Sequence, residues 1–126
     1  MANELILIVE DNEKSRKLVR DVLTFKGYEI IEAETGEAGV RLAQERRPSL
    51  VLMDIRLPGI DGIEALGRLR AEPGTREIPV LAMTASVMTE HRQRVLDARF
   101  DAFQSKPIKV KDFVAAVEQL LEGRRR

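Results

Sequence analysis

The sequence contains no cysteine and no tryptophan among its 126 residues. Without thiols the chain forms neither a disulfide framework nor a zinc site with thiolate ligands, and nothing in it indicates an oxidising compartment. Aromatic residues make up only 4% of the chain, so it offers no aromatic platform on which nucleic-acid bases could stack. A chain of this length buries roughly two-thirds of its unfolded surface. We therefore expect residues 1–126 to fold as a single domain without covalent or metal staples.

The sequence has no excess of charge of either sign, because 21 Lys and Arg residues balance 21 Asp and Glu residues. This balance argues against a surface that binds nucleic acid across the whole domain. The apolar runs are much shorter than a membrane span, and the first residues lack the basic start and apolar stretch of a signal peptide. We therefore expect a cytoplasmic protein with no nucleic-acid or membrane partner.

Two short apolar runs in the sequence end abruptly in carboxylates. Leu50–Met53 stops at Asp54, and Leu5–Val9 stops at the pair Glu10-Asp11. Short, continuous apolar runs of this kind are typical of strands that are buried on both faces of a sheet. Each carboxylate should therefore stand at the C-terminal end of a rigidly packed strand.

Strand-like and helix-like segments alternate five times along the chain. The expected strands are 5–9, 28–31, 50–54, 79–83 and 102–103. The expected helices follow Asn12, Thr35, Asp61 and about Thr89, and the apolar residues of the last helix run from Phe113 to Leu121. The side-chain oxygens of Asn12 and Thr35 suit helix N-termini, and we expect Gly123 to end the last helix. The alternation implies right-handed crossovers and a doubly wound α/β fold with helices on both faces of a parallel sheet.

Polar side chains at the strand ends form a candidate site. Asp11, Asp54, Thr84 and Lys106 stand at or just past strand C-termini, and in open parallel sheets these ends meet at the edge where ligands bind. The carboxylates there, including that of Glu10, repel one another unless a cation joins them. Mg²⁺ suits this set because it prefers oxygen ligands and keeps several waters.

The same residue types suit phosphoryl transfer. A carboxylate oxygen can attack a phosphoryl group to give an acyl phosphate, and Asp54 stands in the middle of the set. Lys106 would pair with a phosphoryl oxygen, and Thr84 would donate its hydroxyl to the product. Asp61 is a rival carboxylate, but its Asp-Gly setting ahead of a helix is typical of a turn or an N-cap.

Taken in order, these motifs resemble those of receiver domains in two-component response regulators. The matching motifs are Glu10-Asp11, Met53-Asp54, Leu57-Pro58-Gly59, Asp61-Gly62, Met83-Thr84-Ala85 and Lys106-Pro107. The resemblance covers nearly the whole chain. It implies a flavodoxin-like (βα)5 fold with strand order 2-1-3-4-5. Because the sequence ends three residues after the last expected helix, we also expect a stand-alone receiver without an output domain, similar to single-domain chemotaxis or cell-cycle regulators.

The resemblance also implies roles for individual residues. A histidine kinase or histidine phosphotransfer protein would phosphorylate Asp54, and the phosphoryl group would be lost slowly by hydrolysis. Mg²⁺ would be bound by Asp11, Asp54 and the backbone carbonyl of Arg56, with Glu10 holding the ion through water. We expect a monomer or weak dimer that binds a downstream target protein.

The resemblance assigns the switch to Thr84 and Phe103, and the binding of the target to the surface formed by the fourth helix, the fifth strand and the fifth helix. A lone aromatic residue in a strand is, however, normally a packing residue. Two positions near this surface depart from the family pattern. Arg99 replaces a common glycine, so either it adopts a left-handed conformation or the helix ends differently. Gln104 replaces an aliphatic strand residue.

Two alternative functions stay open. One is a pseudo-receiver, a docking module that never takes a phosphoryl group. The other is a phosphatase of the haloacid-dehalogenase type, which requires Asp-x-Asp on its first strand and a cap domain. Here Asp54 lies on the third expected strand, and the residue two positions later is Arg56. The interpretation of Asp54 as a phosphoacceptor in a receiver therefore fits the sequence better than a phosphatase of this type does.

Overall fold

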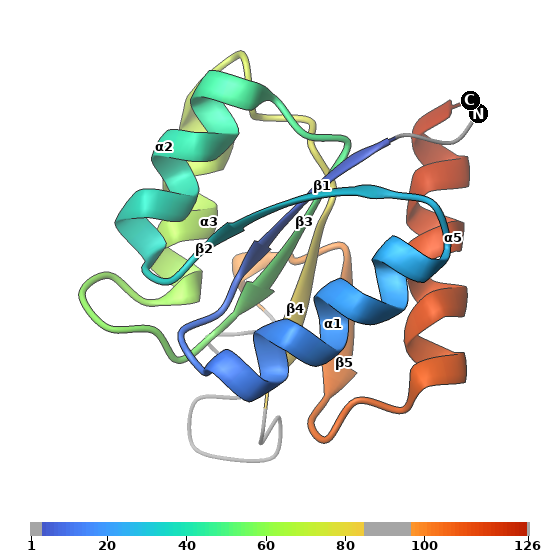
Figure 1. The fold of residues 1–126 in the computed structure, drawn as a ribbon. Coiled ribbons are helices and arrows are strands. Elements are labelled where there is room, and N and C mark those ends of the chain that lie inside the picture. Colours follow the sequence, from blue (N-terminus) through green and yellow to red (C-terminus); the bar gives the residue numbers. More distant parts are fainter. Residues whose placement is uncertain (1–3, 85–96, 126) are drawn as a thin grey trace.

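The computed structural model describes residues 4–84 and 97–125 (Figure 1). Its strands are β1 (Leu5–Val9), β2 (Glu29–Ala33), β3 (Leu50–Asp54), β4 (Val80–Thr84) and β5 (Ala102–Ser105). Its helices in these ranges are α1 (Glu13–Phe25), α2 (Gly36–Arg46), α3 (Gly62–Ala71) and α5 (Val110–Arg125). The strands are parallel and form one sheet in the order β2-β1-β3-β4-β5, which confirms the predicted fold and strand order.

Two expected features lie outside the described residues, and two strands are longer than predicted. The helix expected from about Thr89, and Ala85 of the Met-Thr-Ala motif, lie outside the described residues. Strands β2 and β5 run further than predicted, to Ala33 and Ser105. In the described part of the chain, no helix is long and apolar enough to cross a membrane.

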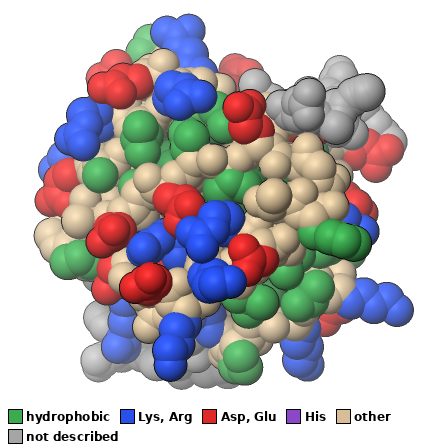
Figure 2. Space-filling model, viewed as in Figure 1, with side chains coloured by type: hydrophobic (Ala, Val, Ile, Leu, Met, Phe, Trp, Pro, Cys, Tyr) green, Lys and Arg blue, Asp and Glu red, His purple; other side chains and the backbone are tan. Residues whose placement is uncertain are grey.

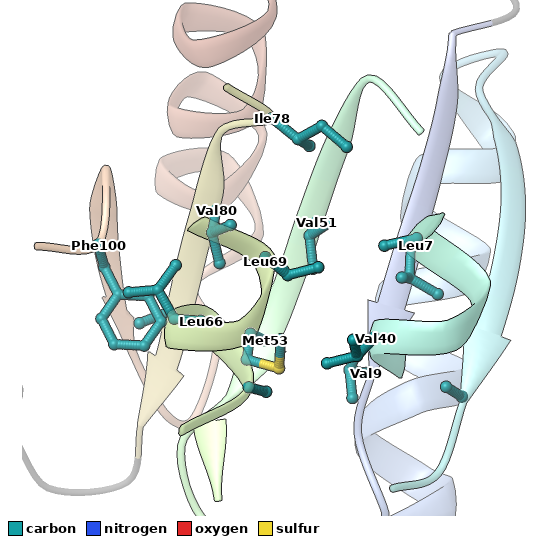
Figure 3. Close-up of a cluster of buried hydrophobic side chains, with 14 of the residues drawn as sticks. Leu7, Val9, Val40, Val51, Met53, Leu66, Leu69, Ile78, Val80 and Phe100 are labelled. Atoms are coloured by element: carbon teal, nitrogen blue, oxygen red, sulfur yellow. The ribbon is translucent and has the colours of Figure 1, made fainter. Parts of the chain in front are cut away.

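Helices cover both faces of the sheet and divide the core into two clusters. Helices α1 and α5 pack on one face, with Leu23 and Phe113 among their buried residues (Figure 1). Helices α2 and α3 pack on the other face, where Val40 and Leu66 point towards residues of the central strands (Figure 3). Every residue of β3 and β4 is buried. Burial on both faces explains why these strands are continuous apolar runs rather than alternating ones.

The helix ends follow local signals, with one exception. The side chains of Asn12, Thr35 and Asp61 accept hydrogen bonds from the backbone amides of the residues three positions later. Asp61 is therefore an N-cap, as its Asp-Gly setting predicted. The prediction that Gly123 ends the last helix is wrong, because α5 continues to Arg125. A helical glycine costs only about 1 kcal/mol relative to alanine, and burial of Leu121, two residues before Gly123, stabilises this part of the helix.

Arg99 adopts a left-handed backbone conformation, with φ of 64°. This confirms the first of the two alternatives for the position where the family commonly has glycine. The side chain of Arg99 is exposed, so no packing requires an arginine here. The left-handed region is unfavourable for a residue with a β-carbon, because that carbon approaches the following carbonyl oxygen. The conformation is therefore a local source of instability just before β5.

Helix α3 begins in close contact with the end of β3. The amide of Gly62 donates a hydrogen bond of 2.8 Å to the carbonyl oxygen of Ile55. A β-carbon at position 62 would overlap the carbonyl oxygen of Asp54 and would lie 2.8 Å from the α-carbon of Ile55. Both are backbone atoms that cannot rotate away. Glycine is thus required where α3 packs against the residue at the end of β3.

Two glycines of α3 provide a matched test of this contact. We expect Gly62→Ala to lower the free energy of unfolding by about 2 kcal/mol, because the new methyl group overlaps backbone atoms. We expect Gly67→Ala to raise it by about 0.5 to 1 kcal/mol, since position 67 has open space and alanine favours a helix. Urea unfolding of both variants measures these changes, and equal effects at the two positions would contradict the close contact.

The left-handed conformation of Arg99 gives a second stability prediction. Arg99→Gly should raise the free energy of unfolding by about 1 kcal/mol, because glycine adopts positive φ without a steric penalty. Arg99→Ala is the control, since it removes the same exposed side chain but keeps the β-carbon. Urea unfolding should show a gain only for the glycine variant. A similar gain for alanine would mean that the arginine side chain, not the backbone, is unfavourable.

Candidate functional site

The strand register brings the predicted site residues to one edge of the sheet. Asp54 is the last residue of β3 and pairs with Met83, the residue before Thr84 at the end of β4. Thr84 in turn pairs with Ser105, which Lys106 follows. Because parallel strands point the same way, these ends lie side by side, as the arrowheads of the central strands show (Figure 1).

Three carboxylates come together at this edge. Glu10, Asp11 and Asp54 each have a carboxylate oxygen within 4.8 Å of those of the other two. Glu10 is only 1% exposed and Asp54 only 6%, whereas Asp11 is exposed. We call these residues the acidic cluster. Its ligands are all oxygen atoms, and one side is open to solvent, which fits a hard divalent cation such as Mg²⁺ that keeps bound waters.

Lys106 lies against the two buried members of the acidic cluster. Its Nζ donates hydrogen bonds of 2.6 Å to Glu10 Oε1 and 3.0 Å to Asp54 Oδ2. The other oxygens of these carboxylates accept from backbone amides, Glu10 Oε2 from Asn12 and Asp54 Oδ1 from Arg56, at 3.0 and 3.2 Å. Each buried carboxylate is therefore held by the lysine on one oxygen and by the backbone on the other.

This arrangement shifts the pKa of two groups. Burial raises the pKa of Glu10 above its ordinary value, since the hydrogen bonds from Lys106 and from the Asn12 amide only partly offset the loss of hydration. The negative charge of Asp54 raises it further. Burial by itself lowers the pKa of Lys106, but the hydrogen bonds to Glu10 and Asp54 outweigh burial and raise it above its ordinary value of 10.5. Lys106 is therefore a fixed positive charge at neutral pH.

The two predicted switch residues lie in different surroundings. Thr84 is buried at the end of β4, and its carbonyl oxygen accepts a 2.9 Å hydrogen bond from the backbone amide of Lys106. Phe103 is not part of the acidic cluster. It packs, partly buried, on the core between the sheet and helices α2 and α3, and its ring meets that of Phe100 edge to face with centroids 6.0 Å apart.

One residue at this edge was missed by the sequence analysis. Arg16 of α1 donates a hydrogen bond of 2.9 Å from Nη1 to the carbonyl oxygen of Glu10. Arg16 stands four residues after the N-cap Asn12, so helical spacing places both on the same side of α1. That spacing was a usable signal, but the direction of the guanidinium also depends on Glu32 of β2, which is distant in the sequence.

Comparison with known proteins gives a consistent result. The family model of the response regulator receiver domain matches residues 6–118. The polar-differentiation response regulator DivK of Brucella anthropi is 40% identical over 116 residues, which cover 92% of this chain and 94% of that protein.

Solved structures agree with the sequence comparison. The receiver domain of a sensor histidine kinase from Pseudomonas aeruginosa, which has a magnesium ion coordinated in its active site cleft, is 30% identical, with a TM-score of 0.91 over 96% of this chain and 99% of that one. The receiver domain of a histidine kinase from Syntrophus aciditrophicus is 31% identical, with a TM-score of 0.92 over 98% of this chain and 93% of that one. Sequence, strand order and acidic edge thus lead to one assignment: the chain belongs to the response regulator receiver domain family.

Proposed function

We propose that this chain is a phosphorylation-controlled switch in which Asp54 accepts a phosphoryl group from a phosphohistidine. The donor would be a histidine kinase or a histidine phosphotransfer protein. The observation that supports this most is the setting of Asp54, a buried carboxylate fixed at a strand end by Lys106 and by the amide of Arg56, beside two further carboxylates. A nucleophile fixed in this way needs little reorganisation before it attacks.

The transfer follows from the chemistry of the groups present. One carboxylate oxygen of Asp54 attacks the phosphorus, so that a P–O bond forms while the P–N bond to the histidine breaks. The electron pair of the broken bond returns to the imidazole ring. Lys106 lies within 3.0 Å of Asp54 Oδ2 and can pair with a phosphoryl oxygen, and the hydroxyl of Thr84 can donate to another.

Glu10, Asp11 and Asp54, with the backbone carbonyl of Arg56, would hold Mg²⁺. The acidic cluster fits this cation, and the magnesium ion in the Pseudomonas aeruginosa receiver domain supports the same assignment. A divalent cation supplies positive charge that neutralises the oxygens of the transferring phosphoryl group. When no metal cation is bound, the positive charge of Lys106 offsets the two buried carboxylates.

The output of the switch would be a change in protein binding. A phosphoryl group adds roughly two negative charges at the sheet edge, which must alter how Lys106 and Thr84 are held. Phe103 lies on β5, an edge strand, and is only partly buried, so it can change its packing without opening the main core. We propose that the target binds the surface of β5 and α5, together with the helix expected from about Thr89, which lies outside the described residues.

The competing function within the receiver family is a pseudo-receiver that binds partners without taking a phosphoryl group. It retains the fold but predicts no covalent change at Asp54. Direct measurement of phosphorylation distinguishes the two functions.

Phosphorylation of Asp54 is tested with acetyl phosphate and Mg²⁺, followed by intact-mass spectrometry. We expect wild type to gain one phosphoryl group and Asp54→Asn to gain none, because an amide oxygen is a far weaker nucleophile than a carboxylate. Asp61→Asn is the matched control, since asparagine also caps a helix and position 61 should not be the acceptor. Wild type that stays unmodified with excess donor and metal would instead favour the pseudo-receiver.

Removal of Lys106 tests its role as the offsetting charge. We expect Lys106→Met, without metal, to lower the free energy of unfolding by about 2 kcal/mol, because two buried carboxylates lose their shared donor. Mg²⁺ should then raise the melting temperature more than in wild type, while phosphorylation by acetyl phosphate slows at least about tenfold. Lys111→Met, at an exposed position of α5, is the control and should behave like wild type.

The same variant has a defined pH dependence. Burial already raises the pKa of Glu10, and loss of Lys106 removes the hydrogen bond that counteracts this. A raised pKa means that the folded state binds the proton more tightly than the unfolded state does. The free energy of unfolding of the metal-free variant should therefore increase as the pH falls from about 7 to about 5. Thermal unfolding over this range measures the trend, and a variant that loses stability as the pH falls would contradict it.

A further inference from the structure

The guanidinium of Arg16 is held at three points beside the acidic cluster. Besides the 2.9 Å bond from Nη1 to the Glu10 carbonyl oxygen, Nε donates to Glu32 Oε1 at 2.9 Å, and Nη2 lies 3.7 Å from Glu34 Oε2. The side chain is only 12% exposed. The planar guanidinium presents its donors in a fixed geometry, so these contacts also fix its orientation.

The carbonyl that Arg16 binds belongs to the peptide unit between two members of the acidic cluster. Strand β1 ends at Val9, and the amide of Glu10 still donates to the carbonyl oxygen of Ala33 at 3.0 Å. The carbonyl of Glu10 is the next backbone group, and Arg16 is its donor. Because a peptide unit is planar, fixing this oxygen also fixes the direction in which the chain enters Asp11.

Asp11 depends on this constraint more than the other two acids do. The carboxylates of Glu10 and Asp54 are buried and are bound by Lys106, whereas Asp11 is exposed to solvent. The position of its carboxylate is therefore set largely by its backbone. A misplacement of this backbone would separate one oxygen ligand from the others.

Placement of Asp11 by Arg16 should strengthen the binding of a cation. Arg16 also carries a positive charge, however, and that charge should weaken it. A guanidinium close to the acidic cluster repels a divalent cation and should weaken its binding. Arg20 offers a comparison, because it donates to both oxygens of Glu32 at 2.9 and 3.0 Å, and Glu10 is not among its hydrogen-bond partners. On the face of the molecule that Figure 2 shows, basic and acidic side chains are intermingled.

We propose that Arg16 is a positioning residue for the divalent cation: it holds the peptide between Glu10 and Asp11 so that Asp11 presents its carboxylate to the metal. Glu32 in turn holds Arg16 and ties the site to β2. This inference rests on the proposed function, since it concerns the same metal site. Removal of Arg16 therefore has opposite consequences for two roles: Mg²⁺ binds more weakly if Arg16 positions Asp11, and more tightly if only its charge matters.

The test measures Mg²⁺ binding by isothermal titration calorimetry in wild type, Arg16→Met and Arg20→Met. We expect the dissociation constant to rise about tenfold in Arg16→Met, which is typical when a residue that orients a metal ligand is removed. In Arg20→Met, which loses the same charge, the constant should stay within about twofold of wild type or fall. Arg16→Lys, which keeps the charge but has one nitrogen in place of the three of the guanidinium, should be intermediate.

A kinetic measurement separates positioning from a general loss of structure. The rate of phosphorylation by acetyl phosphate is followed as a function of Mg²⁺ concentration. We expect Arg16→Met to need more Mg²⁺ for half of its maximal rate but to reach nearly the wild-type maximum. A damaged fold would lower the maximal rate instead, and circular dichroism without metal checks the fold directly.

Each outcome decides between the alternatives. If wild type binds Mg²⁺ and Arg16→Met binds it equally or more tightly, the positioning role is overturned and the proposed function is left intact. Wild type that binds no Mg²⁺ overturns the proposed function itself. If Arg16→Met fails to fold, Arg16→Lys and Glu32→Gln carry the test, because both loosen the guanidinium contacts without removing the side chain. Wild-type affinity in both of these variants would also overturn the proposal.

Discussion

The arrangement of this sheet edge depends on one balance of charge, in which Lys106 offsets carboxylates that burial has removed from water. Glu10 follows β1 and Asp54 ends β3, whereas Lys106 follows β5. Two carboxylates as buried as these repel each other strongly unless a cation binds both. Hydrogen bonds of 2.6 and 3.0 Å to a single ammonium group therefore join groups at the ends of three strands. A bound metal cation would compete with Lys106 for these carboxylates, and a phosphoryl group would compete with the carboxylates for Lys106.

Such a balance requires carboxylates that cannot move away from each other, and the fold supplies this rigidity. Asp54 ends a central strand that is buried at every residue, and Gly62 of α3 packs directly on its carbonyl oxygen. The backbone of Glu10 is fixed by Ala33 on one side and by Arg16 on the other. Where the chain leaves the sheet, the structure thus replaces lost strand hydrogen bonds with contacts from neighbouring elements. Preorganisation of this kind is what a charged reaction site needs.

The strand order and the placement of the site residues could be predicted from the sequence, because its strongest signals come from burial. Continuous apolar runs identify strands buried on both faces, and the rule that parallel strands end at one edge places Asp54 and Lys106 together without any knowledge of contacts. Contacts between residues that are distant in the sequence were harder to predict. The guanidinium of Arg16 binds both the carbonyl of Glu10 and Glu32 on β2, and α5 continues past Gly123 because packing outweighs a small local penalty. The contact between Arg16 and Glu32 joins residues 16 positions apart on different elements, so the spacing within α1 does not predict it.

Lys106 also links the acidic cluster to the outer strand. Its side chain binds Glu10 and Asp54, while its backbone amide binds Thr84 at the point where β5 ends. A phosphoryl group on Asp54 competes with the carboxylates for the ammonium group, so its arrival would weaken the bonds that Lys106 makes to Glu10 and Asp54. In the proposed switch, β5 must accommodate that change, and Phe103 is the partly buried aromatic residue on this strand. A change of charge at the acidic cluster would thereby become a change of packing at the edge of the sheet.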